Sequence, residues 1–159
     1  MYGMLLESVQ HFVKVIYGED AWSKVLTQAG LRHKVFTTHT IYTDETMLRL
    51  ASSCQHVMQD RTHDEFMRFF GTCFVKYFSH YGYDRIIAVC GRNFRDFLHG
   101  IDNLHETMRF SFPKMVSPSF YVTDETTAGC KLHYLTRRSG HQGEIRFITR
   151  QIKHFRSSS

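Results

Sequence analysis

The most informative part of the chain is residues 93–108, which read NFRDFLHGIDNLHETM. The apolar residues recur at helical spacing: counting back from His105, Ile101 lies four residues away, Leu98 seven and Phe94 eleven. A helix with this period places His105 on its apolar face, pointing inward. A buried imidazole needs partners for its nitrogens. Two alternatives provide one: a metal ion, or the backbone carbonyl or buried water that satisfies most core histidines.

A second pattern lies downstream in residues 134–138, which read YLTRR. Side chains alternate between two faces of an extended segment, so Tyr134, Thr136 and Arg138 share one face. Two hydroxyls beside a guanidinium form a row of donors suited to carboxylates. A tetrapyrrole carries an iron that takes an imidazole and two propionates that suit such a row. One haem therefore accounts for both patterns.

With a proline between them, the two patterns resemble a known family, the haem–nitric oxide/oxygen binding (H-NOX) domain at the N-terminus of soluble guanylate cyclase β-type subunits. The spacing His105-x12-Pro118-x15-Tyr134-x-Thr136-x-Arg138 is similar to the motif of that family. The resemblance covers about residues 1–140. The other matching segments are MYG at 1–3, YG at 17–18 with Trp22, FFG at 69–71, GYD at 82–84, FL at 97–98, DNLH at 102–105, FPKM at 112–115 and SPSF at 117–120.

The resemblance implies a role for each residue of the motif. His105 is expected to be the proximal ligand of the iron of haem b, and Pro118 to press on the porphyrin and distort it. Tyr134, Thr136 and Arg138 are expected to bind the propionates, with threonine where the family has serine. The implied fold is α+β: a helix-rich N-terminal two-thirds is followed by a small antiparallel sheet, with the haem between them.

Composition favours a single packed domain over residues 1–159. Hydrophobic residues make up 42% and aromatic residues 14% of the chain, which is typical of a globular core. The net charge is +5, but the basic residues are scattered, which argues against a nucleic-acid partner. The four cysteines form no Cys-x-x-Cys pair, which favours reduced thiols. No segment approaches the ~20 apolar residues of a membrane span and none resembles a signal peptide, so the expected location is cytoplasmic.

Periodicity and capping residues predict the elements. Helices are expected over residues 1–16, 20–28, 45–58, 84–89 and 93–108, and from a capping box at Thr62–Glu65 to just before Gly82. A hairpin is expected from an extended segment at 120–122, a turn over 124–129 and a strand over 130–138.

The residues after Arg138 depart from the family pattern, in which a helix lining the distal side of the haem comes next. Two interpretations of this tail stay open, because residues 144–149 alternate as a strand would. The residues at helical spacing are Ile145, Ile148, Ile152 and Phe155. In either case we expect the part from about 139 to 159 to be truncated or rearranged.

The resemblance implies a sensor rather than an enzyme. Ferrous haem held by His105 alone would bind a diatomic gas, nitric oxide or carbon monoxide, at its open position. Nitric oxide would weaken the bond to His105, and the haem would relax from the distortion imposed by Pro118. The helix would then move and signal to a cyclase or another signalling domain, through a hetero- or homodimer or within one polypeptide.

The choice of gas is predicted from a missing phenol. Relatives that bind oxygen stably often carry a tyrosine on the distal helix, and this chain has none after Tyr134. Nitric oxide is therefore favoured. Two alternatives remain: the oxygen-sensing haem domain of an atypical soluble guanylate cyclase, and a haem-free interaction module.

Overall fold

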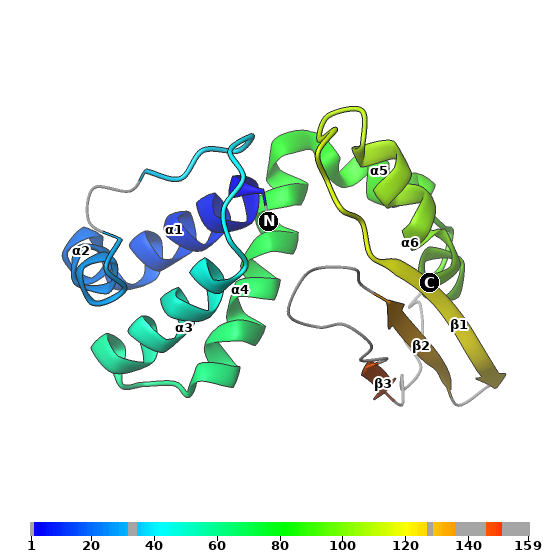
Figure 1. Ribbon diagram of the computed structural model, residues 1–159. Helices are drawn as coiled ribbons and strands as arrows, with labels where there is room; N and C mark the ends of the chain where they lie inside the picture. The colour runs from blue at the N-terminus through cyan, green and yellow to red at the C-terminus, as the bar shows by residue number, and fades with distance from the viewer. Residues whose placement is uncertain (1, 32–34, 127–128, 136–145, 151–159) are drawn as a thin grey trace, which may run out of the picture. The chain divides into compact units, whose positions relative to one another are not determined.

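The protein is seen here as a computed structural model that describes residues 2–31, 35–126, 129–135 and, for the backbone alone, 146–150. The chain forms two compact units, residues 1–83 and 84–159. Helices make up the first unit, and helices with a small sheet make up the second (Figure 1). This is the α+β arrangement expected from the sequence. No helix among the described residues is long and apolar enough to cross a membrane.

The first unit is a bundle of helices around an aromatic and aliphatic core. It contains α1 (Gly3–Tyr17), α2 (Glu19–Gln28), α3 (Glu45–Met58) and α4 (His63–Phe78). The packing is close at the start of α1, where a Cβ on Gly3 would lie 1.9 Å from the carbonyl oxygen of Thr37. The buried core residues are Leu6, Val9, Val13, Trp22, Val25, Ala29, Leu31, Phe36, Leu50, Ala51, Cys54, Phe66 and Phe70.

The predicted capping box at the start of α4 is confirmed. The backbone N–H of Glu65 donates to Thr62 Oγ1 at 3.3 Å, and the Glu65 carboxylate accepts from the backbone N–H of Thr62 at 2.8 Å. These bonds satisfy donors that a helix start would otherwise leave without partners. The helix predicted over 45–58 also has the bounds expected, and the first two helices differ from prediction by one or two residues.

The second unit begins after a wide, π-helical turn (Ser79–Tyr83) in which Gly82 has φ 85°. It contains α5 (Asp84–Val89) and α6 (Phe94–Met108), followed by β1 (Ser119–Thr126), β2 (Gly129–Leu135) and β3 (Arg146–Arg150). The strands form one antiparallel sheet in the order β1-β2-β3, and α6 packs along β1 (Figure 1). As predicted, Asn93 caps α6: its Oδ1 accepts from the backbone N–H of Asp96 at 3.0 Å.

The hairpin differs from its prediction at one end. The turn expected over 124–129 is wrong in extent, because β1 continues to Thr126. The pairing is irregular there: Thr123 faces Lys131 and Thr126 faces Gly129, so β1 carries one extra residue. Asp124 takes φ 52° within this bulge, the backbone conformation that its turn-forming character favours.

The tail is a strand where the structure describes it. Residues 146–150 pair with β2 along the whole length of β3, so the helical interpretation of this segment is wrong. Ile145, Ile152 and Phe155 lie outside the described residues, as do Thr136 and Arg138. The truncation or rearrangement expected over 139–159 falls mostly outside them too and stays a prediction.

Candidate cofactor site on α6 and the sheet

His105 lies in the last third of α6 and is half-buried. Its Nδ1 is 3.0 Å from the carbonyl oxygen of Ile101, one helical turn earlier. A carbonyl can only accept, so Nδ1 carries the proton and the lone pair of the neutral ring lies on Nε2. The carbonyl partner that the sequence left as an alternative to a metal is therefore present. A metal-binding histidine is usually oriented by such a hydrogen bond, made by the ring nitrogen that does not bind the metal.

The imidazole of His105 is stacked on the ring of Phe120, with the centroids 5.4 Å apart and an interplanar angle of 12°. Phe120 belongs to β1, where it is paired with Tyr134 of β2, and the two rings lie 5.2 Å apart. Because paired residues project from the same sheet face, Tyr134 is on the face that meets α6. Phe120 thus brings together the predicted iron ligand and the first of the predicted propionate ligands.

Asp102 fixes α6 against the start of β1. Its Oδ1 accepts a hydrogen bond from the backbone N–H of Phe120 at 2.7 Å, a charge-assisted contact. Sequence reasoning did not assign Asp102 a role, although it lies about one turn before His105 on the same helix. An acidic residue on the histidine's side of the helix was the available signal.

Pro118 is half-buried in the segment between α6 and β1. It lies immediately before the strand, two residues from the ring stacked on His105. Its neighbour Ser117 has a buried Oγ with no hydrogen-bond partner among the described residues. Pro118 is thus two residues along the chain from Phe120, the partner of His105, whereas Thr136 and Arg138 lie outside the described residues.

The donors in this unit suit a haem better than a bare metal ion. Nowhere in the described part of the chain do three His, Cys, Asp or Glu side chains gather as a metal site would require. A metal bound at Nε2 of His105 would need most of its ligands from a macrocycle. The phenol of Tyr134 on the adjoining sheet face is a donor of the kind that a haem propionate accepts. The residues present fit this group.

An amphipathic helix presents an imidazole beside a small antiparallel sheet, and the second nitrogen of the ring is bonded to a carbonyl. This arrangement suits a haem-binding domain. The chain belongs to the H-NOX family: the sequence model of the family described as "Haem-NO-binding" matches residues 2–153. The domain is a gas sensor rather than a catalyst, and haem is its cofactor.

Solved H-NOX structures have the same fold. The unliganded Fe(II) A71G mutant H-NOX protein from K. algicida aligns with a TM-score of 0.73 at 22% identity, over 84% of this chain and 72% of that one. An oxygen-binding H-NOX domain related to soluble guanylate cyclases aligns with a TM-score of 0.64 at 18% identity, over 87% of this chain and 72% of that one.

The curated relatives are soluble guanylate cyclases. Soluble guanylate cyclase 89Da of Drosophila melanogaster is 46% identical over 88% of this chain and 21% of its own length. Soluble guanylate cyclase 89Db of the same fly is 43% identical over 96% of this chain and 22% of its own length. Soluble guanylate cyclase gcy-31 of Caenorhabditis elegans is 36% identical over 96% of this chain and 22% of its own length. The chain spans about a fifth of the length of these relatives.

Proposed function

We propose that this domain senses nitric oxide through a ferrous haem whose iron is held by Nε2 of His105. One observation carries the proposal: the Nδ1 of His105 lies 3.0 Å from the carbonyl oxygen of Ile101. That bond fixes the tautomer and orients the ring, so the Nε2 lone pair is available to a metal. The family description "Haem-NO-binding" supports the choice of gas.

The chain's own residues hold and orient the cofactor. Tyr134, on the sheet face that meets α6, donates to a propionate. Thr136 and Arg138 lie outside the described residues; if strand alternation continues past Leu135, they would share this face and complete the row. Pro118, just before β1, would press on the ring system. The bound haem supplies an open coordination position for a diatomic gas.

The signal leaves through α6. Because His105 would hold the haem, a change at the iron would act on this helix, and its packing against the sheet would be the two-state element that the ligand biases. The relatives named above are guanylate cyclases of about five times this length. The receiver we propose is a guanylate cyclase, either in the same polypeptide or in the partner chain of a dimer, in the cytoplasm.

The preference for nitric oxide and carbon monoxide over oxygen rests on a missing donor. Bound oxygen carries partial negative charge and gains from a hydrogen-bond donor, which nitric oxide does not need. Residues 135–159 contain no tyrosine. Without a tyrosine hydroxyl to stabilise bound oxygen, the site favours nitric oxide, which needs no hydrogen-bond donor.

Absorption spectroscopy of the purified protein tests the proposal. The wild type should show a haem Soret band, and His105→Gly should lose haem until added imidazole fills the vacated place. Asn103→Gly is the matched control, because it puts glycine at an exposed position of the same helix at the same cost to helix propensity. It should keep its haem without imidazole. Unchanged haem binding in His105→Gly would refute the assignment.

A further inference from the structure

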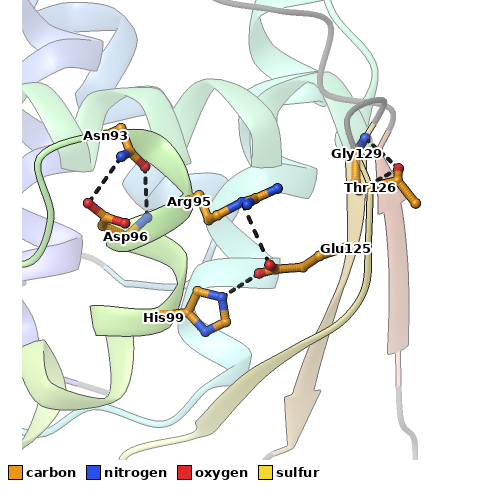
Figure 2. A network of polar contacts seen from close by, with 7 residues as sticks. All are labelled: Asn93, Arg95, Asp96, His99, Glu125, Thr126 and Gly129. Atoms are coloured by element: carbon orange, nitrogen blue, oxygen red, sulfur yellow. Dashed lines mark hydrogen bonds and ion pairs between the residues drawn. The ribbon is translucent and has the colours of Figure 1, made fainter.

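A single carboxylate ties two successive turns of α6 to the end of β1. One oxygen of Glu125 contacts Nε2 of His99, and the other lies 3.6 Å from Nε of Arg95 (Figure 2). Arg95 and His99 are one helical turn apart and project from the same side of α6. The Glu125 side chain is 30% exposed. Removing this one group would therefore release the helix at two places.

The strand is distorted in the way that this contact requires. Phe120 faces α6, so in a regular strand the odd-numbered residues face away from the helix. Tyr121 does so: its ring is stacked on His133, with the centroids 4.3 Å apart. Glu125 is also odd-numbered and yet reaches α6, because the bulge between Thr123 and Thr126 breaks the alternation before it.

The residue at the bulge suits its backbone conformation. Asp124 takes φ 52°, a left-handed conformation that Asp adopts more readily than most residues with a side chain. Bulges of this kind re-aim a neighbouring side chain. The hairpin is also closed next to the bulge, where the backbone N–H of Gly129 donates to Thr126 Oγ1 at 3.2 Å (Figure 2). The end of β1 is thus built to direct Glu125 at the helix.

The contacts of Glu125 lie in the part of α6 that precedes His105. Glu125 holds the first half of the helix at Arg95 and His99. Asp102 holds the middle through the Phe120 amide at 2.7 Å. His105 follows both contacts, so a pull at His105 acts on a helix whose preceding turns are fixed to the sheet.

We propose that Glu125 is a positioning residue of the sensor: it holds the first half of α6 against β1 and so limits how far the helix follows His105. The inference rests on the proposed function, in which His105 holds the haem. The ion pair is partly exposed, and contacts of this kind are individually weak. Weakness suits a contact that a change at the iron can release, whereas the packed Phe120 ring remains in place.

The first test needs no haem. In the 159-residue chain, Glu125→Ala should speed amide hydrogen exchange over residues 97–101 of α6 by about two- to fivefold, the range expected for exposed ion pairs. Glu125→Gln keeps an acceptor oxygen and should have a smaller effect. Asp124→Asn is the matched control, since Asp124 pairs with Lys131 inside the hairpin at 2.5 Å and asparagine tolerates its backbone conformation. This control should leave exchange in α6 unchanged.

The second test reads the iron. If His105 holds the iron, a helix held by Glu125 would keep the iron–histidine bond under tension, so Glu125→Ala should raise the iron–histidine stretching frequency and slow the detachment of His105 by nitric oxide. The reversed pair Arg95→Glu with Glu125→Arg should return both values toward wild type. Faster exchange with an unchanged stretching frequency would make the contact a stabilising one alone and overturn the inference. Unchanged exchange would overturn it as well. Failure of the wild type to bind haem would instead refute the proposed function.

Discussion

The imidazole of His105 lies face to face with the ring of Phe120, 5.4 Å between centroids and 12° between planes. One ring comes from α6 and the other from β1, so the contact joins the two elements of the site. The hydrogen bond from the Phe120 amide to Asp102 lies beside it. Any movement of the histidine relative to the sheet must slide this stack, because the backbone of Phe120 is held by both the helix and β2.

Loss of the Phe120 ring should destabilise the second unit. Phe120→Leu keeps an apolar side chain but removes two aromatic contacts, with His105 and Tyr134. Such pairs contribute about 0.5–1.5 kcal/mol beyond their buried area, so the free energy of unfolding in urea should fall by about 1–2 kcal/mol. Phe110→Leu is the control, since Phe110 is 93% exposed and its loss should change the value by less than about 0.5 kcal/mol. Equal effects would contradict the role of the stack.

Removal of the Asp102 carboxylate should weaken the protection of one backbone amide, that of Phe120. Asp102→Ala leaves the half-buried N–H of Phe120 without its partner, which costs about 1–3 kcal/mol. The amide of Phe120 should then exchange its hydrogen faster than in the wild type. Asp102→Asn retains an acceptor oxygen and should restore most of the protection. If both variants leave this amide protected, some other group accepts its hydrogen.

Much of the helical part could be predicted because its signals are local. Thr62 and Glu65 identify the start of α4, and Asn93 that of α6, through side chains that bond to backbone groups three residues away. Such contacts depend on the sequence order alone. The tail is ambiguous in sequence because residues 144–149 alternate as a strand would while Ile145, Ile148, Ile152 and Phe155 have helical spacing. Pairing of residues 146–150 with β2 decides for a strand there. That pairing is a tertiary effect that no local pattern contains.

The candidate site could be predicted in part for the same reason. Helical spacing turned His105 inward, and its ring does stack on Phe120, but the shared face of Tyr134, Thr136 and Arg138 stays a prediction because only Tyr134 is described. The partners Phe120 and Asp102 depend on how α6 lies on β1, which spacing does not give. Glu125 could not be assigned, since the bulge at Asp124 reverses the face that alternation predicts.

The two adjacent arginines should differ in their effect on haem retention. If the strand continues past Leu135, Arg138 would share the face of Tyr134 and Arg137 would lie on the opposite face. Only Arg138 should then reach a propionate. A charge-assisted pair contributes about 1.5–3 kcal/mol, so Arg138→Ala should transfer its haem to apomyoglobin about ten- to a hundredfold faster. Arg137→Ala should behave like the wild type. Equal loss from the two variants would show that alternation does not hold there.

The first unit should lose stability in alkaline solution. Cys54 is fully buried in its core, and burial, helped by the nearby charge of Asp60, raises the pKa of its thiol from the ordinary 9.0 to about 12. A group with a raised pKa stabilises the fold fully below the unfolded value, and that contribution is lost as the pH rises toward the folded value. The free energy of unfolding should therefore fall between pH 9 and 12.

Cys54→Ala should flatten this dependence on pH, while Cys130→Ala, in β2 of the second unit, should leave it unchanged. Burial and a hydrogen bond to Asp60 also raise the pKa of Tyr17 to about 12, so a smaller slope should persist in Cys54→Ala. Urea titrations at a series of pH values give the slopes directly. The thiol is not the source if wild type and Cys54→Ala have parallel profiles.

The choice of gas should follow from the donors available to the bound ligand. Because residues 135–159 contain no tyrosine, the ferrous protein should bind nitric oxide and carbon monoxide but form no long-lived complex with oxygen in air. Nitric oxide should detach His105 and give the absorption spectrum of a five-coordinate haem, since the proposed function has nitric oxide weaken the bond between the iron and His105. Rapid mixing of the ferrous protein with oxygen-saturated buffer is the direct measurement. A stable oxygen spectrum would mean that another donor, such as Tyr2 or Tyr77, stabilises the bound gas. The oxygen-sensing alternative would then replace nitric oxide sensing as the proposed function, with His105 still the ligand on which both depend.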